Sequence, residues 1–139
     1  MKKLIKESTL RREIRDALVD HKLHKIKVRF PSADIVVEVA DTDFSRAKGL
    51  MFREALGEDE GMLFIFPDMS ARGFWMKNTL IPLSIAYANE MCEIVNIENM
   101  IPHDHRNTMS RGPAKYAIEA NSGWFDKNGI RVGDKFEIA

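Results

Sequence analysis

The segment Phe74–Thr79 combines side chains that could hold a small polar molecule. It carries an indole at Trp75, an ammonium at Lys77 and a hydroxyl at Thr79. In an extended strand these three side chains would share one face and Asn78 would lie on the other, because successive side chains alternate. An aromatic ring beside a cation and a hydroxyl is typical of the wall of a small-molecule cleft. We therefore expect this segment, Asn78 included, to bind an anionic or polyhydroxylated small molecule.

Two further charged residues complete the predicted ligand site. Arg53 ends the second predicted helix, and its planar guanidinium could converge on Lys77 and bind a carboxylate or phosphate. Glu119 lies in a later predicted strand and could add a carboxyl group to the cleft. A structural interpretation stays open, because both cations could instead pair with Glu60 or Glu119 and stabilise the fold.

The stretch His103-Asp104-His105 suggests a metal site. Two imidazoles separated by one residue fall on the same side of an extended segment, and Asp104 adds an oxygen ligand. Zinc needs three or four ligands, however, and the chain has no second motif with two ligands at helical spacing. Solvated loop histidines are therefore the alternative interpretation, and we expect no cofactor.

A hydrolase is an alternative function that the sequence leaves open. Glu60, Asp68 and Glu119 could act as acid and base if two of them face one cleft at the separation that glycosidases use. A water bound to a loop metal would be a second route. The sequence does not place these groups together, so the catalytic residues, if any, are unknown.

The composition is that of a soluble globular domain. The chain has 139 residues, of which 45% are hydrophobic and 30% charged, which fits one domain and argues against long disorder. The longest apolar runs, such as Met62–Phe66, are too short to cross a membrane. No apolar core follows Met1, Lys2 and Lys3, so we expect no signal peptide and a cytoplasmic location. The single cysteine, Cys92, excludes an internal disulfide.

Charge is distributed unevenly along the chain. Residues 1–30 hold ten Lys or Arg against four Asp or Glu, a balance of +6, which the rest of the chain offsets. We predict a basic helical arm over residues 1–25, capped by Ser8 or Thr9, and a single β-rich domain over 26–139. The arm could dock on the body of a second copy, which gives a third interpretation: a structural or partner-binding module that self-associates through this helix. Because the arm lacks interleaved aromatic residues, we expect no nucleic-acid binding.

Local signals predict a mainly β fold. A hairpin or corner is predicted where turn residues separate Ile26–Phe30 from Ile35–Val39. Thr42 is a suitable cap for a helix that runs to about Phe52, in which Gly49 marks a close-packing point or the helix end. Later strands are expected over Met62–Phe66, where Pro67 should end the strand, and over Leu83–Ala88, Cys92–Glu98, Lys115–Ala120 and Phe136–Ile138. With about seven or eight short strands and two or three short helices, we expect a twisted antiparallel sheet or a partly closed barrel.

Several motifs occur together in an order that resembles one known family. They are Gly49-Leu50-Met51-Phe52-Arg53, Glu60–Pro67, Phe74–Leu83, Asn121-Ser122-Gly123-Trp124 and Gly129–Asp134. This set resembles the family catalogued as domain of unknown function 192, over about Val37 to Ile138. The resemblance implies a small β-rich domain, found mostly in prokaryotes, with no agreed substrate. Relatives often begin with an export signal or lipoprotein anchor, and this chain departs from that pattern and from the family in the loop from Pro102 to Pro113.

Overall fold

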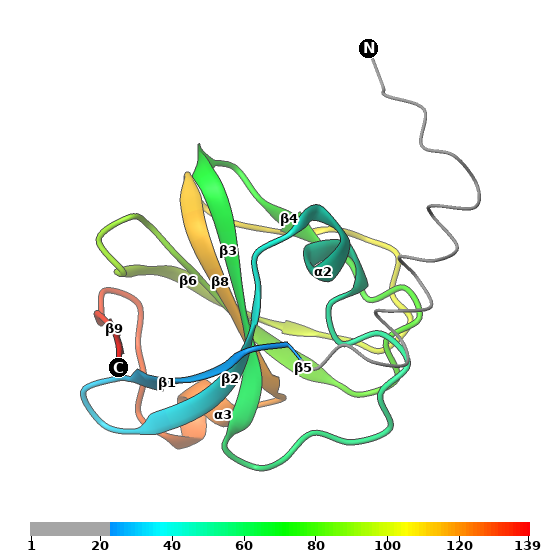
Figure 1. The fold of residues 1–139 in the computed structure, drawn as a ribbon, viewed down its shortest axis with the longest axis horizontal. Helices are drawn as coiled ribbons and strands as arrows, with labels where there is room; N and C mark the ends of the chain where they lie inside the picture. Colours follow the sequence, from blue (N-terminus) through cyan, green and yellow to red (C-terminus); the bar gives the residue numbers. More distant parts are fainter. Residues whose placement is uncertain (1–22) are drawn as a thin grey trace.

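The computed structural model describes residues 23–139, which form a mainly β domain (Figure 1). The elements in chain order are β1 Lys25–Arg29, β2 Asp34–Ala40, α2 Asp43–Lys48, β3 Glu60–Ser70, β4 Gly73–Phe74, β5 Leu83–Ala88, β6 Ile94–Met100, β7 Thr108–Met109, β8 Ala114–Asn121, α3 Trp124–Lys127 and β9 Glu137–Ile138. Seven strands form one sheet in the order β6-β5-β8-β3-β2-β1-β9, and β4 pairs with β7 in a second sheet. The predicted helical arm with its Ser8 or Thr9 cap lies outside the described residues, apart from its last three positions.

The large sheet is mixed and open, whereas the sequence predicted an antiparallel sheet or a partly closed barrel. β2 and β3 are parallel, and the other neighbouring strands are antiparallel. The parallel pair needs a crossover connection, which residues 41–59 provide with α2 at their start. The C-terminal segment makes one isolated bridge, between Glu93 and Lys135, next to β6. Within residues 23–139, however, β6 and β9 do not pair, so the sheet is not closed.

The sheet buries one hydrophobic cluster on each face. The cluster behind α3 contains Trp124 and Phe125 together with β-strand residues such as Val37 and Ile118. The cluster on the other face contains Leu50, which follows α2, and Met76, which follows β4. Figure 1 shows α2 beside β4 and far from α3. The elements that roof the second cluster therefore also form the surroundings of the candidate site.

Helix α2 begins where the sequence predicts and ends earlier. The Thr42 hydroxyl accepts a hydrogen bond from the Ser45 amide, and the Ser45 hydroxyl accepts one from the Thr42 amide, each at 3.0 Å from nitrogen to oxygen. This reciprocal cap confirms the predicted helix start. Gly49 has a φ of 50° and terminates the helix after Lys48. The predicted extension to Phe52 was wrong because Gly49 turns the chain into the left-handed region.

Strand β3 continues through Pro67, which the sequence predicted as its end. The pairing of β3 with β8 shifts register between Ile65 and Ser70, so Pro67 lies in an irregular part of the ladder. A proline there removes no regular ladder hydrogen bond, which is why the strand can continue past it. No helix among residues 23–139 is long and apolar enough to cross a membrane.

Candidate functional site

The Phe74–Thr79 segment is not one extended strand, so the predicted strand alternation was wrong. Only Gly73–Phe74 is in β4, and Asn78 has a φ of 56°, in a turn. Asparagine tolerates this left-handed conformation better than most residues, so the chain can turn here without glycine. As a result Trp75 is 44% exposed, whereas Thr79 is only 5% exposed and donates a hydrogen bond to the Lys77 carbonyl.

Backbone hydrogen bonds hold this segment between two other parts of the chain. The Met76 amide donates to the Asp104 carbonyl at 2.7 Å, and the His103 amide donates to the Thr79 carbonyl at 3.2 Å. On the other side, the Phe52 amide donates to the Asn78 carbonyl at 2.8 Å. The position of Trp75 is therefore fixed by the main chain around it.

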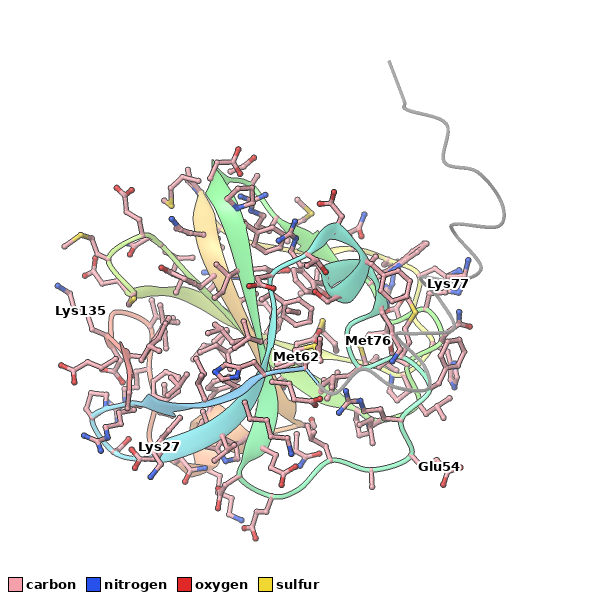
Figure 2. The ribbon with its side chains drawn as sticks, in the orientation of Figure 1. Lys27, Glu54, Met62, Met76, Lys77 and Lys135 are labelled. Carbon is pink, nitrogen blue, oxygen red and sulfur yellow. The ribbon has the colours of Figure 1, made fainter. Side chains whose placement is uncertain are left out.

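Trp75 is flanked by a cation and an imidazole. The Lys77 ammonium nitrogen lies 5.3 Å from the centre of the indole ring, within cation–π range. The His105 ring centre lies 5.7 Å from the indole ring centre. Figure 2 shows Lys77 at the surface of the molecule, while Met76 from the same segment lies inside it. The predicted neighbourhood of indole and amine therefore exists, at the molecular surface.

A pocket of about 250 Å³ borders Trp75. Its walls come from α2 and the residues after it, from β3, from the segment that begins with β4, and from β8. The lining residues are Arg46, Ala47, Lys48, Gly49, Leu50, Met51, Phe64, Phe66, Gly73, Phe74, Trp75, Thr79 and Glu119. Three of the predicted ligand-binding residues, Trp75, Thr79 and Glu119, thus line one concave space.

Glu119 is the most unusual group in this pocket. Its side chain is 4% exposed and makes no hydrogen bond or ion pair within residues 23–139. In that part of the chain no fully enclosed side-chain nitrogen or oxygen lacks a partner, so its carboxyl oxygens retain some contact with the pocket space. Burial away from water disfavours the charged form and raises the pKa of Glu119 to about 8. At neutral pH its carboxyl group is therefore mainly protonated and can both donate and accept a hydrogen bond.

The rest of the pocket lining contains aromatic and basic side chains. The ring centres of Phe64 and Phe74 lie 4.7 Å apart in an edge-to-face arrangement. The Arg46 guanidinium donates to the Ile65 carbonyl and to the Asp43 carboxylate, each at 2.8 Å. Lys48 makes no ion pair with any residue of 23–139. The lining therefore combines aromatic rings with two cations, of which Arg46 is already paired with Asp43.

Arg53 lies outside this pocket and binds another side chain. Its guanidinium donates to both carboxylate oxygens of Glu38, with Nη2 3.0 Å from Oε1. The Arg53 guanidinium is therefore engaged by Glu38 and does not line the pocket. This ion pair fits the alternative interpretation, in which Arg53 stabilises the fold. Its partner is Glu38, however, and not Glu60 or Glu119.

The three residues of the predicted metal site, His103-Asp104-His105, do not form a metal-binding group with one another. His103 and His105 are exposed, and His105 contacts Trp75. Asp104 accepts hydrogen bonds from the Arg106 guanidinium, which lower the pKa of that carboxyl group. Across residues 23–139, no group of three or more His, Cys, Asp or Glu side chains lies close enough together to hold a metal ion.

The loop from Pro102 to Pro113, together with the end of β6, borders a second hollow of about 260 Å³. Two polar side chains in its wall are already engaged: the Asn99 amide oxygen accepts from the Ser84 hydroxyl at 2.6 Å, and Asp104 pairs with Arg106. This loop contacts Trp75 through His105, but none of its residues lines the Trp75 pocket.

Nor does the structure pair two of the predicted catalytic carboxylates in the pocket. Glu60 is exposed at the start of β3, and Asp68 pairs with Arg72. Among the residues that line the pocket, Glu119 is the only acid. The two-carboxylate arrangement of glycosidases is therefore not assembled around it.

Several pocket residues were missed by sequence reasoning. Arg46 and Lys48 lie in the crossover after β2, and no sequence spacing links them to β8. Phe64 and Phe66 carried a usable signal, because residues two apart in a strand share a face and both rings follow Gly61 in one apolar run.

Comparisons with known proteins agree with this fold. The family model DUF192, described as an uncharacterized ACR, matches residues 25–138. A search of the curated proteins finds no match. A crystal structure of a candidate transcription regulator from Sinorhizobium meliloti 1021 superposes with a TM-score of 0.82 at 34% identity, covering 86% of this chain and 97% of that chain. A crystal structure of a protein of unknown function from Novosphingobium aromaticivorans DSM 12444 gives a TM-score of 0.76 at 38% identity, covering 86% and 89%.

Proposed function

We propose that this chain, which belongs to the uncharacterised DUF192 family, binds an anionic or polyhydroxylated small molecule in the pocket beside Trp75. The observation that carries this proposal is the Glu119 carboxyl group, which is buried, lacks a hydrogen-bond partner within residues 23–139 and borders the pocket. Burying such a group without a partner costs roughly 1–3 kcal/mol in proteins. A bound molecule that supplies the missing partner would recover this cost.

The walls of the pocket support the proposed ligand class. Trp75 offers a half-exposed aromatic face, on which the apolar face of a sugar or of another ring can stack. Lys48, which lines the pocket, and Lys77, which lies beside the Trp75 ring, attract anionic groups. The volume of about 250 Å³ lies just below the roughly 300–1,000 Å³ of pockets that hold drug-sized ligands. A ligand the size of a single ring or a short chain therefore fits best.

Binding accounts for the lining better than hydrolysis does. A carboxylate-dependent hydrolase of the glycosidase type needs two acids that face each other, and the pocket lining supplies only Glu119. A single protonated acid is sufficient to orient a bound hydroxyl or carboxylate. We therefore place binding ahead of catalysis for this pocket.

A thermal-shift screen tests the proposal. Sugars, organic acids and nucleotides are added to the full chain, and a ligand at a hundred times its Kd should stabilise the fold by about 2.7 kcal/mol. The shift should disappear in Trp75→Ala and Glu119→Met. It should persist in Phe52→Ala, a matched control whose side chain is 59% exposed and does not line the pocket. If no compound raises the melting temperature, or if a shift survives in both pocket variants, the proposal is wrong.

A further inference from the structure

We infer that the ligand of this pocket presents a hydrogen-bond acceptor, such as a carbonyl, carboxylate or hydroxyl oxygen, to a Glu119 side chain that acts as the donor, and that it places no cation there. This inference rests on the proposed binding function and specifies its chemistry. An aromatic pocket with a buried acid could also hold an ammonium group, as aromatic cages do. The surroundings of Glu119 distinguish these two possibilities.

The first argument is the apolar setting of Glu119. Its cross-strand partners are Met62 on β3 and Ile85 on β5. Both partners belong to the hydrophobic cluster on the pocket face of the sheet. A carboxylate anion in such surroundings needs several donors to offset its lost hydration. No side chain or amide of residues 23–139 donates to it, so the geometry suits the uncharged acid.

The second argument is the charge of the other groups around the pocket. Arg46 and Lys48 are the charged side chains that share the lining with Glu119, and both are cations. Tyr87 on β5 is the nearby titratable group on the sheet; burial raises the pKa of its phenol, so it stays neutral. The lining residues of β3 and of the segment from Gly73 to Thr79 carry no charge. Arg46 is paired with Asp43, whereas Lys48 has no ion-pair partner within residues 23–139, so the charge in the lining disfavours a cationic ligand and does not disfavour an anionic or neutral acceptor.

The two ligand classes predict opposite dependences on pH. An acceptor needs the protonated carboxyl, so its affinity should fall once the pH exceeds the pKa of Glu119, which burial raises to about 8. A cation needs the carboxylate, so its affinity should rise over the same range. The sign of the pH effect thus reports which form of Glu119 meets the ligand.

Three probes with the same ring and nearly the same length test the inference: 2-phenylacetamide, phenylacetate and 2-phenylethylamine. Each is titrated into the full chain carrying carbon-13 methionine methyl groups, at about pH 6 and about pH 9.5. The methyl signal of Met51 reports on the pocket that it lines, and that of exposed Met91 is the remote control. Phenylacetamide should shift Met51 at the lower pH and bind roughly 30-fold more weakly at the higher pH, about 1.5 units above the pKa.

Two variants identify the donor. Glu119→Gln keeps a donor but does not titrate, so it should bind phenylacetamide about equally at both pH values. Glu119→Met has no donor, so it should lose its affinity for phenylacetamide at both pH values. Circular dichroism at each pH checks that the variants are folded.

The possible failures are separable. If phenylethylamine binds more tightly than phenylacetamide, or if the affinity of wild type for phenylacetamide does not change with pH, the inferred donor role is wrong and the binding pocket stands. If none of the three probes shifts Met51 at either pH, the inferred donor role is wrong, and the thermal-shift screen decides separately whether the pocket binds another ligand.

Discussion

Replacing Glu119 by Gln should remove a large dependence of stability on pH. In the folded chain burial raises the pKa of Glu119 from 4.5 to about 8. The folded state therefore holds this proton more tightly than the unfolded state does. Its contribution to stability is complete below about pH 4.5 and is lost as the pH rises toward 8. Glutamine has the same shape and cannot ionise, so this contribution is absent from the variant.

The size of the effect follows from the pKa difference. A difference of about 3.5 units, at about 1.4 kcal/mol per unit, corresponds to roughly 5 kcal/mol over the whole range. Between about pH 5 and pH 9 the wild type should lose about 4 kcal/mol relative to Glu119→Gln. Other titrating groups, such as Tyr116 and Cys92, whose pKa values burial also raises, are common to both proteins and cancel in the difference.

Urea denaturation at a series of pH values measures this difference directly. Both proteins are unfolded under matched salt, and the free energies of unfolding are compared at equal m-values. Glu60→Gln, which changes an exposed acid at the start of β3, is the matched control and should follow the wild type. Parallel stability curves for wild type and Glu119→Gln would show that Glu119 is ionised in the folded chain, and the reasoning about a protonated donor would be refuted.

Three further substitutions should have smaller effects on stability. Gly61→Ala should destabilise the fold by roughly 1–3 kcal/mol in urea denaturation, because its new methyl group would lie 2.2 Å from the Glu119 carbonyl oxygen; Gly112→Ala, where nothing lies within 4 Å, should cost little. Arg53→Ala should lower stability by about 1 kcal/mol through its partly buried pair with Glu38 and should leave probe binding in the Met51 titration unchanged. Thr42→Ala should cost about 1 kcal/mol by removing the cap of α2, and an equal melting temperature would argue against that cap.

Short-range signals in the sequence predicted much of the fold. The hairpin of β1 and β2 follows from two β-branched runs that flank a turn, and β5 and most of β6 lie where apolar runs predicted strands. Thr42 predicted the start of α2 because capping depends on the residues within one turn. The strands of the structure confirm the predicted mainly β class. The match of the family model to residues 25–138 confirms the predicted family.

Features that depend on tertiary pairing were not predictable from the sequence. The parallel alignment of β2 with β3 depends on where the crossover returns, and no local pattern encodes that. The register shift that accommodates Pro67 likewise exists only in the pairing of β3 with β8. In the segment that begins at Phe74, the predicted alternation of side chains between two faces fails because Asn78 turns the chain. The dipeptide Lys77-Asn78 was the available signal, because asparagine favours turns.

The candidate site was predicted in part. Trp75, Thr79 and Glu119 line one pocket, while Lys77 lies beside the indole and Arg53 binds elsewhere. Of the residues that the sequence missed, Arg46 and Lys48 come from the crossover, and Phe64 and Phe66 come from β3.

The two tryptophans differ in exposure, so their fluorescence can report on two parts of the molecule. Trp75 is 44% exposed at the edge of the pocket, whereas Trp124 is 3% exposed and packs against Phe30 and Phe125 on the far face of the sheet. Iodide can quench the fluorescence of an indole only where it can reach the ring, so it should dim Trp75 and spare Trp124. Occupancy of the pocket and integrity of the opposite core can therefore be followed as two separate emission signals from one unlabelled sample.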